Sequence, residues 1–95
     1  MATKQACLEQ VTIEVEDFAG KVASLKERLA RANGQEKLRH SWEIYVLRER
    51  FEDFRQHVLK LEEADEEHLE EIRQSTDSAW SDLNGMIEAF LNEIC

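Results

Sequence analysis

The sequence of 95 residues contains no proline and only three glycines. Both residue types interrupt helices, proline because it lacks a backbone N–H and glycine because it loses the most conformational freedom on folding. Glutamate, leucine, alanine, arginine and lysine, which favour long helices, dominate instead. This composition predicts an all-α protein without a sheet, and a chain of this length is expected to form one domain, residues 1–95.

Long apolar runs are also missing. No stretch approaches the length of about 18 apolar residues that marks a membrane-spanning helix. The first ten residues, MATKQACLEQ, lack the basic and apolar blocks of a signal peptide. We therefore expect no transmembrane segment and a cytoplasmic location. The two cysteines, Cys7 and Cys95, are too few for the disulfide framework of a small secreted protein, so we expect reduced thiols.

Positive charge is scarce in the second part of the chain. Residues 1–60 hold eleven Lys and Arg against ten Asp and Glu, whereas residues 61–95 hold only Arg73 against eleven acids. The net charge of the whole chain is −9. Such a field repels phosphate groups and anionic lipid heads, so the sequence argues against binding to nucleic acid or to an anionic membrane.

Apolar side chains in the first segment follow a heptad. They recur at alternating spacings of four and three, at Leu8, Val11, Val15, Phe18, Val22, Leu25, Leu29 and Ala32. Such a period places one narrow apolar seam along a helix, as in a coiled coil, and Ile13 lies off the seam and is expected to be exposed. The segment ends at Asn33-Gly34, because both residues tolerate the left-handed conformation that closes a helix. We predict a helix over residues 3–32 and a turn at 33–34.

The second segment carries the same period. Its seam consists of Ile44, Leu47, Phe51, Phe54, Val58 and Leu61. Leu38, Trp42 and Tyr45 are expected to widen this apolar face at its start, and we interpret Trp42 as core packing. Because a short turn joins two heptad helices, the predicted helix over 35–63 is expected to lie antiparallel to the first.

The third segment changes its period. Its apolar face consists of Leu69, Ile72, Thr76, Trp80, Leu83, Ile87, Phe90 and Ile94, and several of these residues lie 11 positions apart. An 11-residue repeat gives an apolar stripe that runs nearly straight along a helix. We predict a helix over residues 66–94, and we interpret Trp80 as core packing rather than as a ligand-stacking residue.

The join between the second and third segments leaves two arrangements open. Glutamates four residues apart, such as Glu62–Glu66, repel each other and weaken a helix here without breaking it. Either the chain turns near Ala64 or near Ser75 and the third segment folds back, or one helix continues straight for about 90 Å and meets another chain. The predicted fold class is an antiparallel helical hairpin or a three-helix coiled-coil bundle.

The C-terminal stretch EEIRQSTDSAWSDLNGMIEAFLNEI contains an Ala-Trp-x-x-Leu pattern, Ala79 to Leu83, followed by Gly85 and a second aromatic residue, Phe90. In this it resembles a group of small, largely uncharacterised bacterial coiled-coil proteins that are likened to apolipoproteins. The resemblance implies two heptad-like helices, an acidic linker and a final Ala-Trp-x-x-Leu segment, and little chemistry. The chain departs from the pattern because the Trp80-to-Phe90 spacing is one residue short and the group's basic residues are missing here.

Carboxylate and histidine residues at helical spacing are the candidate metal ligands. The pairs are Glu36/His40, Asp53/His57 and Asp65/His68. A di-iron helical bundle needs two Glu-x-x-His pairs and two further glutamates, and the chain offers Asp65-x-x-His68 once. We interpret these residues as ordinary helical ion pairs and predict no metal site.

No pattern of a catalytic centre is present in the sequence. Cys7 lies on the first turn of a predicted helix, where we expect fraying, and no histidine is near it in sequence. The chain has no glycine-rich phosphate loop and no nucleophile elbow. We predict neither enzyme activity nor a cofactor.

The third segment carries the strongest functional hypothesis. An amphipathic helix with aromatic residues can dock into a groove on another protein, and the acids along this one favour a basic partner. We predict a structural or protein-interaction module, with Trp80, Leu83, Ile87 and Phe90 contacting a protein partner or a second copy in a homodimer. The alternatives are a protein that binds zwitterionic or apolar lipid surfaces, which the 11-residue period suggests, and a helical bundle that binds a metal through carboxylates and histidine.

Overall fold

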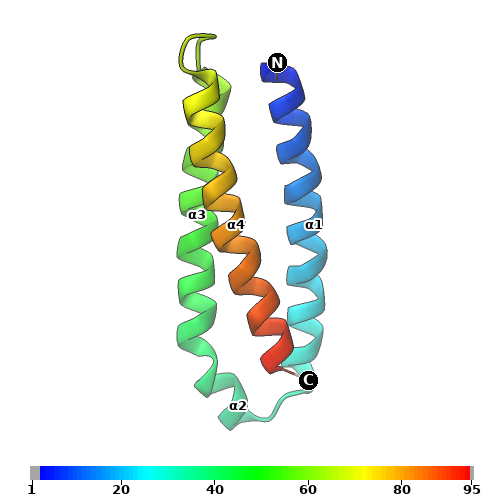
Figure 1. The fold of residues 1–95 in the computed structure, drawn as a ribbon. Coiled ribbons are helices and arrows are strands. Elements are labelled where there is room, and N and C mark those ends of the chain that lie inside the picture. Colours follow the sequence, from blue (N-terminus) through cyan, green and yellow to red (C-terminus); the bar gives the residue numbers. More distant parts are fainter. Residues whose placement is uncertain (1–2, 95) are drawn as a thin grey trace.

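Three long helices and one short helix make up the computed structural model, which describes residues 3–94 (Figure 1). They are α1 (Lys4–Arg31), α2 (Gly34–Arg39), α3 (Ser41–Glu63) and α4 (Leu69–Glu93). Within residues 3–94 there is no strand, and no helix combines the length and the hydropathy that a bilayer crossing requires. The predicted all-α class is confirmed.

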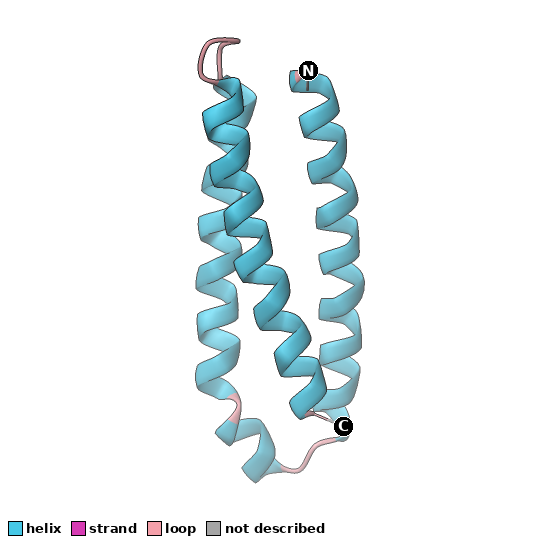
Figure 2. Cartoon of the chain, viewed as in Figure 1, coloured by secondary structure: helices cyan, strands magenta, loops and turns pink. Residues whose placement is uncertain are grey.

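The three long helices alternate in direction. α3 runs antiparallel to α1, and α4 returns parallel to α1 (Figure 1). The links between helices are short: residues 32–33, residue 40 and residues 64–68 (Figure 2). α4 packs most extensively on α3 and also contacts α1, and the chain measures 51 × 19 × 16 Å. Of the two arrangements that the sequence leaves open, the third segment therefore adopts the one that folds back.

The link between α1 and α2 is extended and contains no left-handed turn. Ala32 and Asn33 both have extended backbone angles, and no residue within 3–94 has a positive φ. The Asn33 side chain accepts a hydrogen bond from the Glu36 backbone N–H at 2.9 Å, so Asn33 caps the start of α2. The chain does turn here, but the predicted mechanism, left-handed closure at Asn33-Gly34, is wrong.

The predicted helix over 35–63 is interrupted at His40. This residue ends α2 and precedes α3, with φ −91° and ψ 0°. Its backbone N–H donates to Glu36 O at 3.1 Å, and its carbonyl accepts from the Ile44 N–H at 3.0 Å. Both backbone groups therefore stay satisfied while the chain changes direction between α2 and α3 (Figure 1).

Residues 64–68 reverse the chain between α3 and α4. Asp65 accepts from the His68 backbone N–H through its carboxylate, at 3.0 Å, and through its own carbonyl, at 3.3 Å. Lys4 Nζ donates to the carbonyl of Ala64 at 3.2 Å, which ties the start of α1 to this loop. The corner near Ala64 is therefore the one that the chain uses, and the predicted helix over 66–94 begins later than expected, at Leu69 in α4.

The polar stretch from residue 74 to residue 78 does not break α4. The hydroxyls of Ser75 and Thr76 donate to backbone carbonyls four residues earlier, at 3.3 and 2.8 Å. Thr76 also lies 3.4 Å from the carbonyl of His57 on α3, and it is only 1% exposed. Its hydroxyl is thus satisfied inside the core, and the corner predicted near Ser75 does not form.

Most of the core is built from the predicted apolar seams, but Val15 of the first seam is 37% exposed, and Cys7 and Ala79 of the core belong to no predicted seam. Its buried hydrophobic residues are Cys7, Val11, Phe18, Leu25, Leu47, Phe54, Leu61, Leu69, Ala79, Leu83, Ile87, Phe90 and Ile94. Cys7 belongs to this set, at 6% exposure, and lies near the start of α1. Ile13 is 60% exposed, as its position off the seam predicts.

Four aromatic side chains join the three long helices near the middle of the bundle. Phe18 of α1 stacks on Phe51 of α3, with ring centroids 5.0 Å apart. Trp80 of α4 lies 6.5 Å from Phe18 and 5.5 Å from Phe54. Trp80 therefore packs against the core from α4, which confirms its predicted packing role.

Two basic residues of α1 attach to α4. Lys21 Nζ lies 2.9 Å from a carboxylate oxygen of Glu88 and 2.9 Å from one of Asp17. Arg28 Nη1 donates to the Leu91 carbonyl at 2.6 Å. The last turn of α4 has no basic residue of its own, so Arg28 supplies the positive charge that a helix C-terminus favours.

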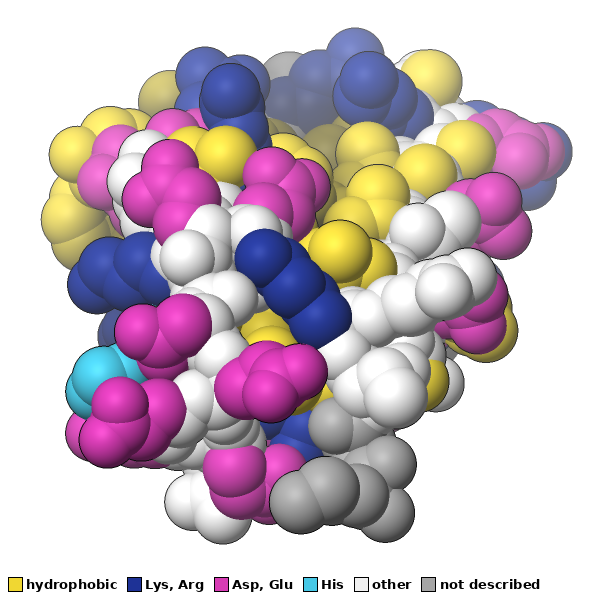
Figure 3. Space-filling view, turned by 90° about the horizontal axis from the view of Figure 1, so that it is seen from above, with side chains coloured by type: hydrophobic (Ala, Val, Ile, Leu, Met, Phe, Trp, Pro, Cys, Tyr) yellow, Lys and Arg dark blue, Asp and Glu magenta, His cyan; other side chains and the backbone are white. Residues whose placement is uncertain are grey.

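Acidic side chains gather at the end of the molecule that holds the α3–α4 loop (Figure 3). The residues responsible are exposed: Glu62, Glu63, Asp65, Glu66 and Glu67. The His68 ring lies 2.7 Å from the Asp65 carboxylate, and this hydrogen bond lowers the pKa of Asp65 and raises the pKa of His68. The loop thus places like charges in solvent, where water and salt screen them.

The buried stripe of α4 predicts a large stability difference between two isoleucines. Ile87→Ala should lower the free energy of unfolding by about 2–5 kcal/mol, because Ile87 is fully buried and its loss leaves a cavity. Ile13→Ala, the same substitution at an exposed site, should change it by less than about 0.5 kcal/mol. Urea denaturation followed by circular dichroism measures both. Equal losses in the two variants would contradict the packing of α4 described above.

Candidate functional site

Exposed hydrophobic side chains gather where α2 meets α3. Leu38 is 75% exposed, Trp42 68% and Tyr45 53%. The Trp42 and Tyr45 rings stack on each other, with centroids 5.5 Å apart. The prediction that Trp42 packs in the core is therefore wrong, and Leu38 and Tyr45 do not widen the buried face of α3 as expected. Trp42 precedes the seam residue Ile44 by two positions, which places it about 200° around the helix from the buried face.

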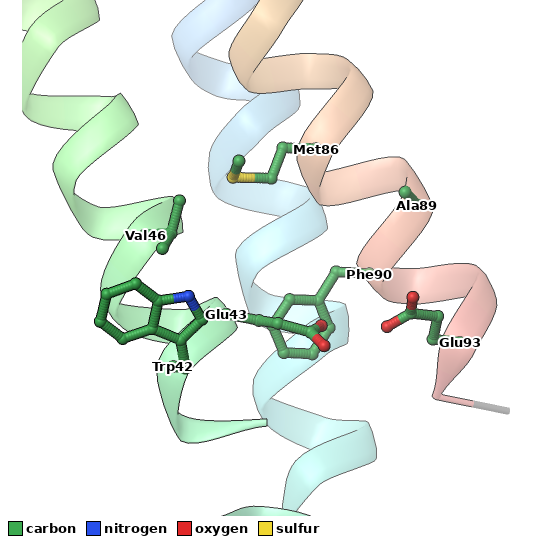
Figure 4. Close-up of a pocket in the computed structure, with 7 residues that line it drawn as sticks. All are labelled: Trp42, Glu43, Val46, Met86, Ala89, Phe90 and Glu93. Atoms are coloured by element: carbon green, nitrogen blue, oxygen red, sulfur yellow. The ribbon is translucent and has the colours of Figure 1, made fainter. Parts of the chain in front are cut away.

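A groove of about 380 Å³ lies beside this patch, between the start of α3 and the end of α4 (Figure 4). Its lining residues are Trp42, Glu43, Val46, Met86, Ala89, Phe90 and Glu93. Five of these seven side chains are apolar, and the two others are carboxylates, Glu43 on α3 and Glu93 on α4. The two carboxylates point toward each other across the groove (Figure 4). An apolar groove with a few convergent polar groups is the usual form of a binding site.

His40 lies next to this groove and is 5% exposed. Its ring packs against Phe90, with centroids 5.3 Å apart. Its Nδ1 atom lies 3.4 Å from Glu43 Oε2 and makes no hydrogen bond. A buried ring nitrogen without a hydrogen-bond partner is uncommon in folded proteins, so this atom calls for a physical explanation.

The residues predicted to contact a partner lie in the bundle interior. Leu83 and Ile87 are fully buried and Phe90 is 2% exposed, while Trp80 is half-buried against Phe18 and Phe54. In this fold they hold α4 on the other helices. Only Phe90 reaches the groove, where it contributes to the lining.

Of the metal-ligand pairs considered from the sequence, only His40 enters a set of three ligating side chains, and it does so without Glu36. His68 and Asp65 are both exposed, and His57 Nε2 lies 3.8 Å from an Asp53 oxygen. Over residues 3–94, the one group of three ligating side chains is a different one: His40, Glu43 and Glu93. Their ligand atoms lie within 4.8 Å of one another. The His40-x-x-Glu43 spacing was visible in the sequence, but Glu93 comes from another helix and had no local signal.

A second, smaller cavity of about 160 Å³ lies between α1 and α4. Cys7, Glu14, Arg73 and Asp77 are among its lining residues. Glu14 is 8% exposed, and its Oε1 has no hydrogen-bond partner. Burial raises the pKa of Glu14, and the negative charge of Asp77 raises it further, while a hydrogen bond from Gln10 opposes the shift. Cys95, the other cysteine considered from the sequence, lies outside the described residues.

Comparisons with known protein families, with curated proteins and with solved structures found no match to this chain. The resemblance to bacterial coiled-coil proteins therefore stays a prediction.

The raised pKa of Glu14 predicts a pH-dependent gain in stability on Glu14→Gln. The folded state holds the proton of Glu14 to a higher pH than the unfolded state does, so ionisation destabilises the fold as the pH rises above the usual value of 4.5. Glu14→Gln removes this cost and should raise the Tm at pH 7 by about 1–5 °C. The gain should disappear below pH 4.5, where both states are protonated.

Thermal melts from pH 4 to pH 8 measure this effect, and Glu16→Gln is the matched control. Glu16 is exposed on the same helix, so this variant makes the same change in net charge without affecting a buried carboxylate. A Tm gain that is equal in both variants, or one that persists at low pH, would show that the burial of Glu14 is not its cause.

Proposed function

We propose that this chain is a protein-interaction module without catalytic activity, and that the groove between α3 and α4 is its contact surface. The occupant that fits the groove is a helical segment of another protein, with an apolar anchor side chain flanked by lysine or arginine. The proposal rests chiefly on one observation: Trp42 is 68% exposed at the edge of an apolar groove.

The apolar part of the groove supports binding through an anchor side chain. Trp42 and Tyr45 are already stacked on each other, and tryptophan and tyrosine are enriched among residues that dominate binding energy at interfaces. Leu38 extends the exposed apolar surface at 75% exposure. A monomeric protein rarely leaves several large hydrophobic side chains together in water without a use for them.

Charge supports a basic partner over a second copy of this chain. The two polar side chains that line the groove, Glu43 and Glu93, are both carboxylates. A second copy would bring another net charge of −9 toward the first. Opposite charge at the rim of an interface speeds association and selects partners, whereas like charge repels them.

The other functional predictions from the sequence require a rearrangement of the bundle. Partner binding through Trp80, Leu83, Ile87 and Phe90 would require α4 to leave the bundle, because these residues pack against the other helices. Lipid binding through the 11-residue stripe would require the same release. Both stay predictions, as does the cytoplasmic location, and the exposed groove needs no such rearrangement.

Two designed helical peptides test the proposed groove. They share one apolar face with a central tryptophan and differ only in carrying lysine or glutamate along its flanks. We expect the lysine peptide to bind at least about tenfold more tightly than the glutamate peptide, measured by fluorescence anisotropy. Trp42→Ala should weaken binding of the lysine peptide by about tenfold or more.

Ile13→Ala is the matched control, since Ile13 is 60% exposed on α1 and is not a lining residue of the groove. Ile13→Ala should leave the affinity for the lysine peptide unchanged. Because Trp42→Ala does not alter the charge of the protein, nonspecific attraction of the cationic peptide would persist in that variant. Equal affinity for both peptides, or full binding by Trp42→Ala, would refute the proposal. A wild-type dimer that Trp42→Ala dissociates would also refute it, because a second copy would then cover the groove.

A further inference from the structure

His40 has an unusual position in the fold, at a helix break and with a buried ring. It stands at the break between α2 and α3, so its ring leaves the backbone where the helix axis changes. The ring is buried against Phe90 of α4, and Nδ1 points toward the Glu43 carboxylate without forming a hydrogen bond. The buried Nδ1 thus has no hydrogen-bond partner and lies beside Glu43, one of the two acids that line the groove.

Glu43 and Glu93 complete a set of three ligating groups around this position. Glu43 follows His40 by three residues, one turn into α3, and Glu93 is in the last turn of α4. One ligand atom from each of the three residues lies within 4.8 Å of the others. The two carboxylates face each other from separate helices (Figure 4), which only the return of α4 makes possible.

We propose that His40, Glu43 and Glu93 form a binding site for a zinc ion. Zinc accepts imidazole nitrogen and carboxylate oxygen at bond lengths of about 2.0–2.2 Å, and ligands at such distances lie roughly 3.3–3.6 Å apart in a tetrahedron. The distance from His40 Nδ1 to Glu43 Oε2, 3.4 Å, already has this value. Three protein ligands leave the fourth position of a tetrahedral zinc ion to water or to a group on a bound partner.

The ligand set also separates zinc from the hard cations. Calcium and magnesium prefer oxygen ligands alone, whereas imidazole suits zinc and its neighbours among the transition metals. The charges fit too, because two carboxylates neutralise a divalent ion beside an otherwise apolar groove. This inference does not rest on the proposed docking function: both proposals use Glu43 and Glu93, but docking depends chiefly on Trp42 and the zinc site on His40.

Isothermal titration of the full chain with zinc chloride tests the site. We expect binding of one zinc ion per chain, and a rise in Tm of about 5–10 °C when free zinc exceeds the dissociation constant tenfold. His40→Gln and Glu93→Gln should each weaken binding by about tenfold or more. Glu93 is exposed, so Glu93→Gln keeps the variant folded even if His40→Gln does not.

Matched variants exclude other sources of binding. His68→Gln makes the same change at an exposed histidine that pairs with Asp65, and it should leave zinc affinity unchanged. Cys95→Ser tests the thiol that follows Glu93 by two positions in the sequence, and it should also bind zinc normally. Magnesium chloride should give no comparable rise in Tm.

Four results would overturn the zinc site. They are the absence of one-to-one binding, undiminished binding in Glu93→Gln, loss of binding in His68→Gln or Cys95→Ser, and an equal Tm shift with magnesium. None of them would affect the docking proposal, since the peptide experiment is carried out without zinc and reads the effect of Trp42→Ala.

Discussion

Burial of the apolar stripe of α4 against α3 and α1 holds the three long helices together. Leu83 and Ile87 are completely buried and Phe90 nearly so, because α3 and α1 cover the same face of α4. Burial of side chains of this size contributes about 1.5–3 kcal/mol each, more than any surface ion pair in the chain. Lys21 and Arg28 then fix how α4 lies along α1 through contacts to a carboxylate and to the end of the helix.

The return of α4 also creates the groove. Its last turn ends beside the break at His40, so one helix end and one helix start meet there. The core uses the face of α3 that carries Ile44 and Leu47, and this leaves Trp42 in water at the edge of the groove. The same geometry places Glu93 opposite Glu43. Docking of a basic helix and binding of zinc are thus two proposals about one end of the bundle.

Local periodicity explains which parts of the structure could be predicted. Heptad and 11-residue patterns indicate which face of a helix is apolar. They are sufficient to predict three long helices and the burial of residues such as Phe54 and Leu83. Periodicity does not indicate how far one helix is shifted or rotated relative to another. The meeting of His40 with Glu93 depends on that alignment, so no local signal predicted it. The prediction for Trp42 is wrong because it relies on the apolar character of the side chain and neglects its angular position on α3.

Small-angle X-ray scattering of the chain in reducing buffer tests whether α4 folds back onto α1 and α3, because it reports shape and mass together. If α4 folds back within one chain, the radius of gyration should lie close to the 15.4 Å of the Cα trace, at a mass of 11.1 kDa. A particle of about 90 Å with twice that mass would mean instead that residues 35–94 continue as one helix and pair with another copy. The return of α4, and with it the groove, would then be wrong.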